Sequence, residues 1–180
     1  MPDESEKELL QQFIKNAQAA VATVEVITAN TSSLNAALQK QIGDDDAVLF
    51  ASPNDVDANL FNDFLLNEKV IKNPDKEQLK HTKTGITDAF CGIASTGSVC
   101  VPVAQNLTSA VTMLTQRHIV VLNSNSIVPK PRDVFSENYL EGKGLKRSFS
   151  FITGPSATAD MGPLVRGVHG PGKLHIIVLD

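Results

Sequence analysis

The sequence predicts an α/β domain in which a mainly parallel sheet is covered by helices on both faces. Segments with the spacing of helices alternate with β-branched apolar segments over most of the chain, which is typical of βαβ units. One short connection in the middle of the chain joins two strands and predicts a β-hairpin. The 180 residues, 42% of them hydrophobic, suffice for one core, so we expect a single domain over residues 1–180.

The first half of the chain is predicted to contain three helices and two strands. Apolar residues recur at helical spacing from Leu9 to Ala20, and Gly43 is placed to end the second helix, which residues 31–33 are expected to cap. The expected order is helix 5–20, strand 21–27, helix 34–42, strand 47–51 and helix 55–67. The polar stretch 67–83 that follows is expected to be the least ordered part.

The second half is predicted to continue the alternation after a hairpin. Strands 86–94 and 98–103 are joined at Ser95-Thr96-Gly97, a connection short enough for a hairpin. The expected order is then helix 107–116, strand 118–122, turn 123–126, helix 133–139, strand 149–153, a glycine-rich loop, a short helix near Leu164 and strand 174–179. Pro163 favours a start of that short helix at Gly162-Pro163.

Charge and cysteine content exclude several function classes. Sixteen Lys and Arg against twenty Asp and Glu give a net charge of −4, and the basic residues form no extended run, so we expect no nucleic-acid partner. Cys91 and Cys100 form no CxxC pair and no HExxH motif occurs, so we expect no metal site and no iron–sulfur cluster in this chain. No cofactor is identified from the sequence.

The sequence also predicts where the protein resides. Its first residues are acidic where a signal peptide is basic, and no apolar run approaches the roughly 20 residues that span a bilayer. We therefore expect no membrane span and a cytoplasmic location, where thiols stay reduced.

The main candidate site is the loop from Gly154 to Asp160. Ligands of open parallel sheets bind beyond the carboxyl ends of the strands, where we expect this loop to lie. Gly154 permits close backbone approach, and Ser156, Thr158 and backbone amides are suited to hold a small carboxylate or phosphate. Asp160 would orient a donor. The alternative is structural: Ser156 and Thr158 cap a helix whose positive end Asp160 favours.

Two further features belong to the same hypothesis. The turn residues Thr96, Gly97 and Ser98 offer hydroxyls to a ligand, although such a turn also forms without one. His169 lies between Gly167 and Gly170 and is a candidate for proton transfer, or else a hydrogen-bonded structural group. His118 and His175 each begin an apolar run and are expected to be hydrogen-bonded at strand ends.

At these loops the chain resembles the LUD (lactate utilisation) domain family, in its LutC/YkgG branch. The residues that carry the resemblance are Ile86-Thr87, Ile93-Ala94-Ser95-Thr96-Gly97-Ser98, His118-Ile119, Gly154-Pro155-Ser156-Ala157-Thr158-Ala159-Asp160 and Gly167-Val168-His169-Gly170-Pro171. The resemblance implies a three-layer α/β/α sandwich similar to the NagB/RpiA/CoA-transferase-like fold. It also implies a part in the oxidation of L-lactate to pyruvate beside partner proteins that carry iron–sulfur clusters.

The chain departs from this family pattern at five positions of the two loops and the helix between them, one of which is Thr115, near a proline position. Ser95 stands where the family usually has an acidic residue, and Ser109 stands near an arginine position. Ala157 replaces an arginine or another polar residue, and Gly162 replaces a glutamate. Potential acid, base and anion-pairing groups are therefore missing, whereas Thr96, Gly97, Ser156, Thr158, Asp160 and His169 are present.

Three functional hypotheses follow. The leading one is a subunit of an L-lactate oxidation system whose own pocket binds a small carboxylate or phosphate. In it Thr96, Gly97, Ser98, Gly154, Ser156 and Thr158 bind the ligand, while His169 and Asp160 are catalytic. The second is a non-catalytic scaffold for iron–sulfur redox partners. The third is an enzyme of the CoA-transferase or sugar-phosphate type, for which the matched loops offer no glutamate nucleophile.

Overall fold

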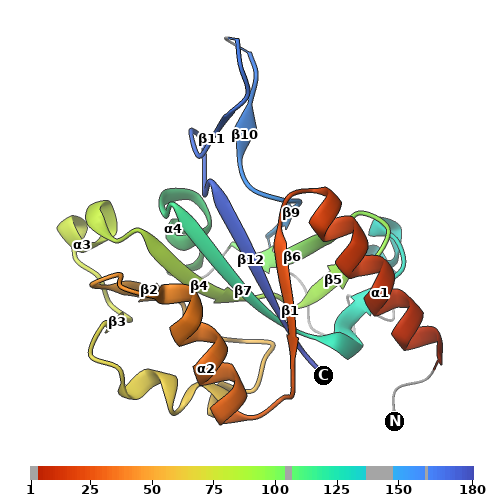
Figure 1. Cartoon of the computed structure of the whole chain (residues 1–180), viewed down its shortest axis with the longest axis horizontal. Coiled ribbons are helices and arrows are strands. Elements are labelled where there is room, and N and C mark those ends of the chain that lie inside the picture. The colour runs from red at the N-terminus through yellow and green to blue at the C-terminus, as the bar shows by residue number, and fades with distance from the viewer. Residues whose placement is uncertain (1–3, 104–106, 137–147, 161) are drawn as a thin grey trace.

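Six strands form one parallel sheet through the middle of the molecule in the computed structural model (Figure 1). The structure describes residues 4–103, 107–136, 148–160 and 162–180. In spatial order the strands are β1 (Thr23–Ile27), β12 (Lys173–Leu179), β7 (Arg117–Asn123), β4 (Thr84–Asp88), β2 (Val48–Phe50) and β3 (Val70–Ile71). The predicted α/β class with a mainly parallel sheet is confirmed.

The two seven-residue strands β7 and β12 form the centre of this sheet. They pair along their whole length, from Lys173 opposite Arg117 to Leu179 opposite Asn123. Successive side chains of a strand point to opposite faces, so each central strand serves two cores. Ile176 of β12 belongs to the core on one face, and Ile177 belongs to the core on the other.

One face of the sheet is covered by α2 (Thr31–Ile42), η1 (Ala58–Phe61) and η2 (Phe64–Leu66). The side chain of Asn30 caps α2 by accepting from the amide of Ser33, so the helix begins before the predicted residue 34. Gly43, at φ +57°, ends the helix as predicted.

The predicted helix over residues 55–67 is wrong in type, because η1 and η2 are separate 3₁₀ turns. Short polar side chains there compete for the backbone: Asp57 accepts from the amide of Asn59, and Asn67 accepts from the amide of Lys69. Phe61 and Phe64 are nevertheless fully buried against Phe50, so the expected apolar face exists.

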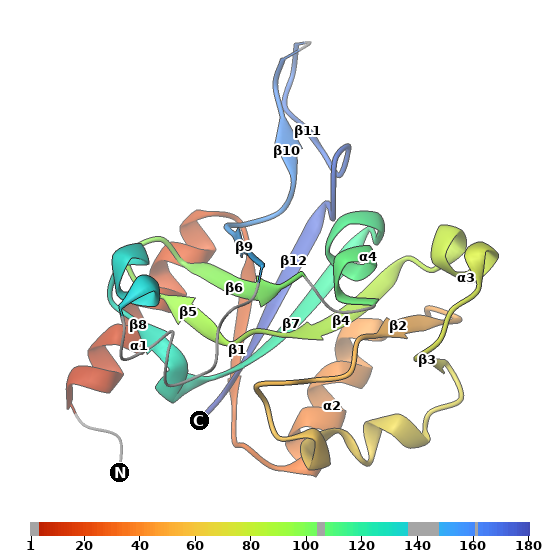
Figure 2. The ribbon, with the colours of Figure 1, turned by 180° about the vertical axis from the view of Figure 1, so that it is seen from behind.

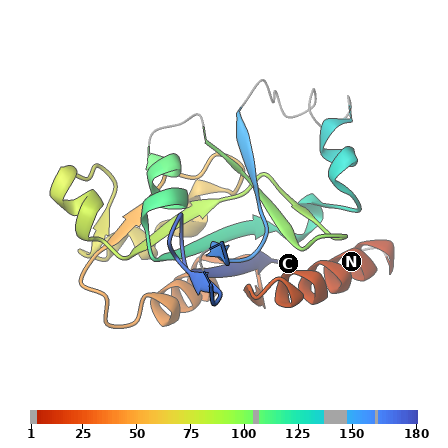
Figure 3. The ribbon, with the colours of Figure 1, turned by 90° about the horizontal axis from the view of Figure 1, so that it is seen from above.

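The opposite face carries α1 (Glu4–Ala19), α4 (Leu107–Leu114) and a second, four-stranded sheet. Figure 3 shows α2 (orange) and α4 (green) on opposite sides of the central strands. The strands of the second sheet are, in spatial order, β8 (Ile127–Val128), β5 (Cys91–Ile93), β6 (Ser98–Pro102) and β9 (Phe149–Ile152). The antiparallel pair of β5 and β6 confirms the predicted hairpin. The predicted strand 86–94 is in fact two strands, because the chain changes sheets between Asp88 and Cys91.

Two short elements occupy the polar stretch that was expected to be least ordered. They are β3 and α3 (Lys76–His81). Asp75 and Gln78 form a reciprocal capping box at the start of α3, which explains why so polar a segment folds into a helix. Farther along, η3 (Ser124–Ser126) takes the place of the predicted turn, and η4 (Pro131–Phe135) covers the start of the predicted helix 133–139, whose last three residues lie outside the described ones.

The predicted helix near Leu164 is wrong, because that segment belongs to a two-stranded hairpin. Strands β10 (Ala157–Thr158) and β11 (Val165–Arg166) pair antiparallel, with Thr158 opposite Val165. Gly162 at φ +133° and Gly167 at φ +80° adopt backbone conformations that a helix does not contain. The hairpin stands away from the rest of the molecule (Figures 1 and 2). Among the described residues, no helix has the length and apolar character needed to cross a membrane.

Candidate functional site

The two predicted loops meet through a chain of three hydroxyl groups. Ser98 begins β6, and its Oγ lies 2.6 Å from Oγ1 of Thr153, the residue that follows β9. On its other side the same Oγ lies 2.6 Å from Oγ1 of Thr96. Because β6 and β9 are paired antiparallel strands, the start of one and the end of the other lie side by side.

The glycines of both loops pack against the carboxyl end of α1. A Cβ atom on Gly97 would lie 2.0 Å from the backbone nitrogen of Ala17, and one on Gly154 would lie 2.0 Å from the carbonyl oxygen of Ala20. Both glycines have positive φ, which other residues rarely adopt. Close approach to the protein's own backbone therefore explains Gly97 and Gly154 without a ligand.

Several of the backbone amides expected to hold an anion are already hydrogen-bonded. The amides of Thr96 and Gly97 both donate to the carbonyl of Ile93, at 3.4 and 2.9 Å. The amide of Ser156 donates to the carbonyl of Pro171 at 2.8 Å. An anion at these loops would consequently meet side-chain donors, and these three amides are not available to it.

A cavity of about 230 Å³ lies beside the second loop. We call it the loop cavity, and its lining is formed by Thr112, His118, Leu174 and the segments 151–156 and 169–171. Of the predicted site residues, Gly154, Ser156 and His169 line it. Thr96, Gly97 and Ser98 do not line the cavity, and Ser98 is linked to it only through its contact with Thr153. Thr158 and Asp160 do not line it either, because they belong to the projecting hairpin.

The loop cavity lies at the amino ends of the central strands, so the expected location beyond their carboxyl ends is wrong. Pro171 directly precedes β12, and His118 and Leu174 are paired near the start of β7 and β12. In Figure 1 the loop enters the end of β12 that is opposite to the C-terminus. The loop follows β9 of the second sheet, which explains the error: the sequence reveals a strand before the loop and cannot reveal which sheet holds it.

His118 is a site residue that the sequence assigned only a structural role. It is buried, and its Nε2 lies 2.8 Å from Oγ1 of Thr87, in agreement with the expected hydrogen bond at a strand end. Burial lowers the pKa of His118 to about 3, so the imidazole is neutral at physiological pH. A neutral imidazole beside the loop cavity can accept or donate one hydrogen bond but supplies no positive charge.

Two of the departures from the family pattern have structural partners. The hydroxyl of Ser109 donates to the carbonyl of Val103, and the amide of Ser95 donates to the carbonyl of Pro129. Ala157 is exposed in β10, and a Cβ atom on Gly162 would meet nothing within 4 Å.

The carboxyl edge of the sheet carries a different constellation, which the sequence analysis missed. Oδ2 of Asp88, the last residue of β4, accepts from the amides of Asn54, Asp55 and Val56 at 2.7, 2.6 and 3.1 Å. Burial raises the pKa of this carboxyl group, although the three amides act in the opposite direction. The signal available in the sequence was Asp88 itself, the one charged residue within the predicted strand 86–94.

The connections after β2 and β4 leave the sheet toward opposite faces, which makes this edge a topological switch point. A cavity of about 710 Å³ lies there and is lined by residues that include Ser52, Asn54, Lys72 and Thr108. Within the described ranges, no three His, Cys, Asp or Glu side chains gather in a group able to hold a metal ion.

Comparison with known proteins places these loops in a family. The model of the LUD domain matches residues 10–179. Lactate utilization protein C of Bacillus subtilis is 31% identical over 109 residues, which are 58% of this chain and 45% of that protein. YkgG of Escherichia coli is 24% identical over 181 aligned residues, which cover 93% of this chain and 78% of YkgG. The matched region is thus less than half the length of the Bacillus protein.

A solved structure has the same fold. The crystal structure of a DUF162 family protein from Deinococcus radiodurans superimposes with a TM-score of 0.72 at 19% identity and covers 99% of this chain and all of that one. At this level of identity the likeness supports the fold alone. The family model extends over nearly the whole sequence and includes both loops, and the chain therefore belongs to the LUD domain family.

Proposed function

We propose that this chain is a LutC/YkgG-like cytoplasmic component of a system that oxidises L-lactate to pyruvate, and that its loop cavity binds a small carboxylate. The observation that carries the proposal is the contact between the hydroxyls of Ser98, in the first family loop, and Thr153, which directly precedes the second. Their oxygens lie 2.6 Å apart, and Thr153 lines the cavity. The names of the relatives from Bacillus subtilis and related species support the link to lactate utilisation.

The size of the cavity favours a small ligand. At about 230 Å³ it is smaller than the roughly 300–1,000 Å³ of sites for drug-sized molecules, and a three-carbon acid fits such a volume. The hydroxyl of Ser156 is the proposed donor to the carboxylate, and His169, exposed at the rim, is the proposed proton carrier. The roles proposed for Thr158 and Asp160 require the hairpin to approach the cavity when the ligand binds.

Calorimetric titration with L-lactate and pyruvate tests this proposal. We expect binding that Ser156→Ala weakens about tenfold, because a hydrogen bond to a charged group contributes roughly 1.5–3 kcal/mol. His169→Gln should lower any turnover of the complete system more than it lowers affinity. Ser32→Ala, an exposed serine on α2, is the matched control. Equal affinities of the wild-type protein and Ser156→Ala, or no binding of either acid, would refute the assignment.

A second candidate function is a scaffold for iron–sulfur redox partners, and the projecting hairpin favours it. Leu164, Val165 and Val168 are 60%, 50% and 53% exposed, which is unusual for three apolar residues so close together. Co-purification with the cluster-bearing proteins of a lactate system tests this candidate. The Val165→Asp/Val168→Asp variant should lose these partners and retain its folding transition, and retention of the partners would contradict the scaffold role.

A further inference from the structure

A groove rich in Lys and Arg runs along the amino edge of the main sheet. It consists of two adjoining hollows of about 640 and 420 Å³ that share Arg117, Arg166, Gly172 and Lys173 in their linings. We call it the amino-edge groove. It lies on the α2 side of β12, because Thr23 and His175 line it, whereas the loop cavity lies on the side of His118.

The charge of this groove is opposite to that of the whole chain. Its lining contains five basic side chains and one acidic one, Asp45, although the protein carries a net charge of −4. The basic residues come from four elements and one loop: Lys40 of α2, Lys83 before β4, Arg117 of β7, Arg166 of β11 and Lys173 of β12. Such a concentration of one sign within a concave surface attracts anions.

One cation of the groove is fixed in position by the fold. Nη1 of Arg117 donates to the carbonyl of Gln41 at 2.5 Å and to Oδ2 of Asp45 at 3.4 Å, and the side chain is only 29% exposed. Among the described residues, nothing accepts from its Nε or Nη2. A guanidinium held by one nitrogen can still present the others to the paired oxygens of a phosphate group.

Two other cations have no counterion. Arg166 and Lys173 are exposed and form no ion pair with any described residue, in contrast to Lys40, which lies 3.1 Å from Glu25. Arg166 belongs to the projecting hairpin and Lys173 begins β12, so they reach the groove from different directions. An anion between them would gain two contacts without breaking an existing salt bridge.

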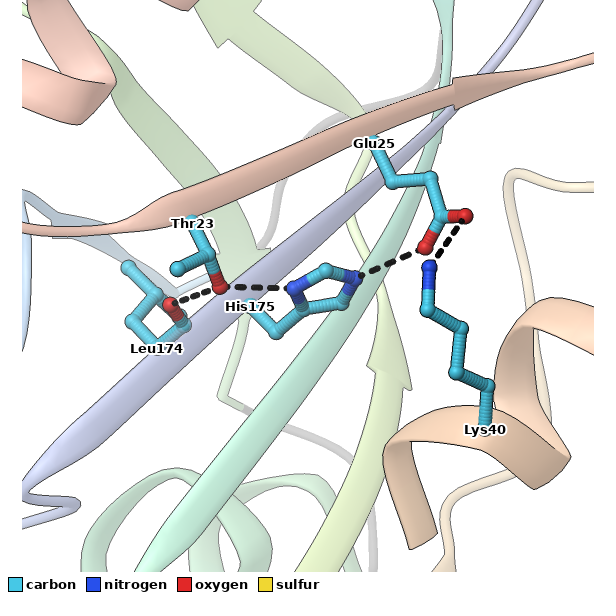
Figure 4. A network of polar contacts seen from close by, with 5 residues as sticks. All are labelled: Thr23, Glu25, Lys40, Leu174 and His175. Atoms are coloured by element: carbon cyan, nitrogen blue, oxygen red, sulfur yellow. Dashed lines mark hydrogen bonds and ion pairs between the residues drawn. The ribbon is translucent and has the colours of Figure 1, made fainter.

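Thr23 and His175 of the groove lining form a polar network with Glu25 (Figure 4), in which the Glu25 carboxylate forms an ion pair with Lys40. Thr23 Oγ1 lies 2.6 Å from Nδ1 of His175, and Nε2 of that imidazole lies 3.7 Å from Oε2 of Glu25. Burial lowers the pKa of His175, while Glu25 raises it and Lys40 and Arg117 lower it further. The positive charge of the groove therefore comes from Lys and Arg, which stay charged at neutral pH.

We propose that the amino-edge groove binds the phosphate groups of a phosphorylated small molecule that carries two or more negative charges. Arg117 and Arg166 offer forked donors that match phosphate oxygens, and Lys173 and Lys83 add point charges. The volume suits a ligand considerably larger than a three-carbon acid. The groove and the loop cavity share Pro155 and Leu174, and Arg166 belongs to the same hairpin as Thr158. No side chain proposed to bind the carboxylate, however, is proposed to bind the phosphate groups.

Calorimetric titration of the whole chain with inorganic pyrophosphate and with ATP, at low salt, tests this inference. Arg166→Gln/Lys173→Gln should weaken the binding of both probes at least about tenfold, because two charge-assisted contacts are lost. The matched control is Lys7→Gln/Lys15→Gln, which removes two exposed cations of α1 and should change the affinity less than about twofold. Citrate, a polycarboxylate of similar charge, should bind more weakly than pyrophosphate.

Three results would overturn the inference: no binding of either phosphorylated probe, equal affinities of the groove variant and the wild-type protein, or citrate binding as tightly as pyrophosphate. Ser156→Ala separates the two proposals, because it should leave pyrophosphate binding unchanged. The groove variant in turn should leave the binding of L-lactate or pyruvate unchanged. Failure at one site is thereby distinguishable from failure at the other.

Discussion

Oγ of Ser98 lies between two other hydroxyl oxygens, 2.6 Å from that of Thr153 and 2.6 Å from that of Thr96. The contact with Thr153 joins segments that are 55 residues apart in the chain. Ser98 is buried, whereas Thr153 is exposed. Water can therefore replace a lost hydrogen-bond partner of Thr153, but it cannot reach the hydroxyl of Ser98. The position of the second loop thus depends on a hydroxyl at the start of β6.

We predict that Ser98→Ala and Thr153→Val are energetically coupled. Ser98→Ala should lower the free energy of unfolding by about 1–2 kcal/mol, because it removes two hydrogen bonds from a buried position. Thr153→Val should lower it by about 0.5–1 kcal/mol. In urea denaturation the double variant should lose less than the sum of the two, by at least about 0.5 kcal/mol. Strict additivity would mean that the contact contributes nothing.

The meeting of these loops could be predicted from the sequence, but their hydrogen bonding could not. The hypothesis of one shared pocket required the two loops to meet, and they do so through Ser98 and Thr153, although Thr96, Gly97 and Ser98 do not line the cavity. The amide of Ser156 is not free, because it donates to the carbonyl of Pro171. Pro171 follows the hairpin, and only the folded structure brings it close to Ser156. A local pattern contains no information about such a partner.

A substitution at Gly97 should be far more damaging than one at Gly43, although both residues have positive φ. At Gly43 an added Cβ meets nothing within 4 Å, so Gly43→Ala carries only the penalty of an unfavourable backbone conformation, roughly 1–3 kcal/mol. At Gly97 the Cβ would lie 2.0 Å from the nitrogen of Ala17, and the overlap adds about 1–3 kcal/mol.

Thermal and urea denaturation of the two variants checks this difference. Similar losses for Gly97→Ala and Gly43→Ala would mean that α1 moves freely away from the turn. The comparison tests the packing of α1 on the hairpin, because both glycines have positive φ and only Gly97 has backbone atoms of α1 within reach of an added Cβ.

The amino-edge groove illustrates a different limit of the sequence. Its basic residues are spread from Lys40 to Lys173, and no two of them are close enough in the chain to form a run. The basic residues form no cluster along the sequence, but five of them line one groove in the folded protein. Parallel strands begin at one edge of the sheet, and this gathers residues from the start of β7 and β12 into one place.

Stability should fall with decreasing pH because of His118. Its pKa is lowered to about 3 in the folded protein, whereas the unfolded chain binds a proton near the ordinary value of 6.5. Between these values the unfolded state holds more protons, so the free energy of unfolding decreases by up to about 1.4 kcal/mol for each pH unit lost. His118→Gln should flatten this slope in urea denaturation between about pH 7 and 5.

The lowered pKa of His175 also makes stability fall with decreasing pH, whereas the raised pKa of Asp88 acts in the opposite direction. Both groups remain in His118→Gln, so their contributions cancel when the two slopes are subtracted. As an independent check, the imidazole C–H resonance of His118 should not shift from neutral pH to about pH 5. A titrating resonance in that range would show that solvent reaches His118.

The wrong helix near Leu164 has a cause that lies outside its own segment. Pro163 and the glycines around Leu164 were compatible with the start of a helix, and only the pairing of Thr158 with Val165 decides for a hairpin. Strongly periodic segments such as α1 and the central strands were predictable because their apolar spacing reflects burial directly. The two-residue strands β10 and β11 depend on each other for their hydrogen bonds, and a partner of this kind is not visible in the sequence of either strand.

Asp88 should be the most sensitive carboxylate at the carboxyl edge. Asp88→Ala leaves the amides of Asn54, Asp55 and Val56 without their acceptor and should lower the free energy of unfolding by about 3 kcal/mol. Asp88→Asn keeps one oxygen acceptor and should lose about 1 kcal/mol. Asp63→Ala, at an exposed residue that makes no capping hydrogen bond, should stay within about 0.5 kcal/mol of the wild-type protein.

The pH dependence of Asp88→Asn provides a second test with a definite sign. The pKa of Asp88 is higher in the folded protein than in the unfolded chain, so the folded state binds the proton more readily. The contribution of Asp88 to the free energy of unfolding therefore falls as pH rises through the folded pKa. Asparagine has no such dependence. The stability difference between the wild-type protein and Asp88→Asn should therefore be larger at about pH 4 than at pH 7 by urea denaturation, and the reverse order would mean that the three amides outweigh burial at this carboxylate.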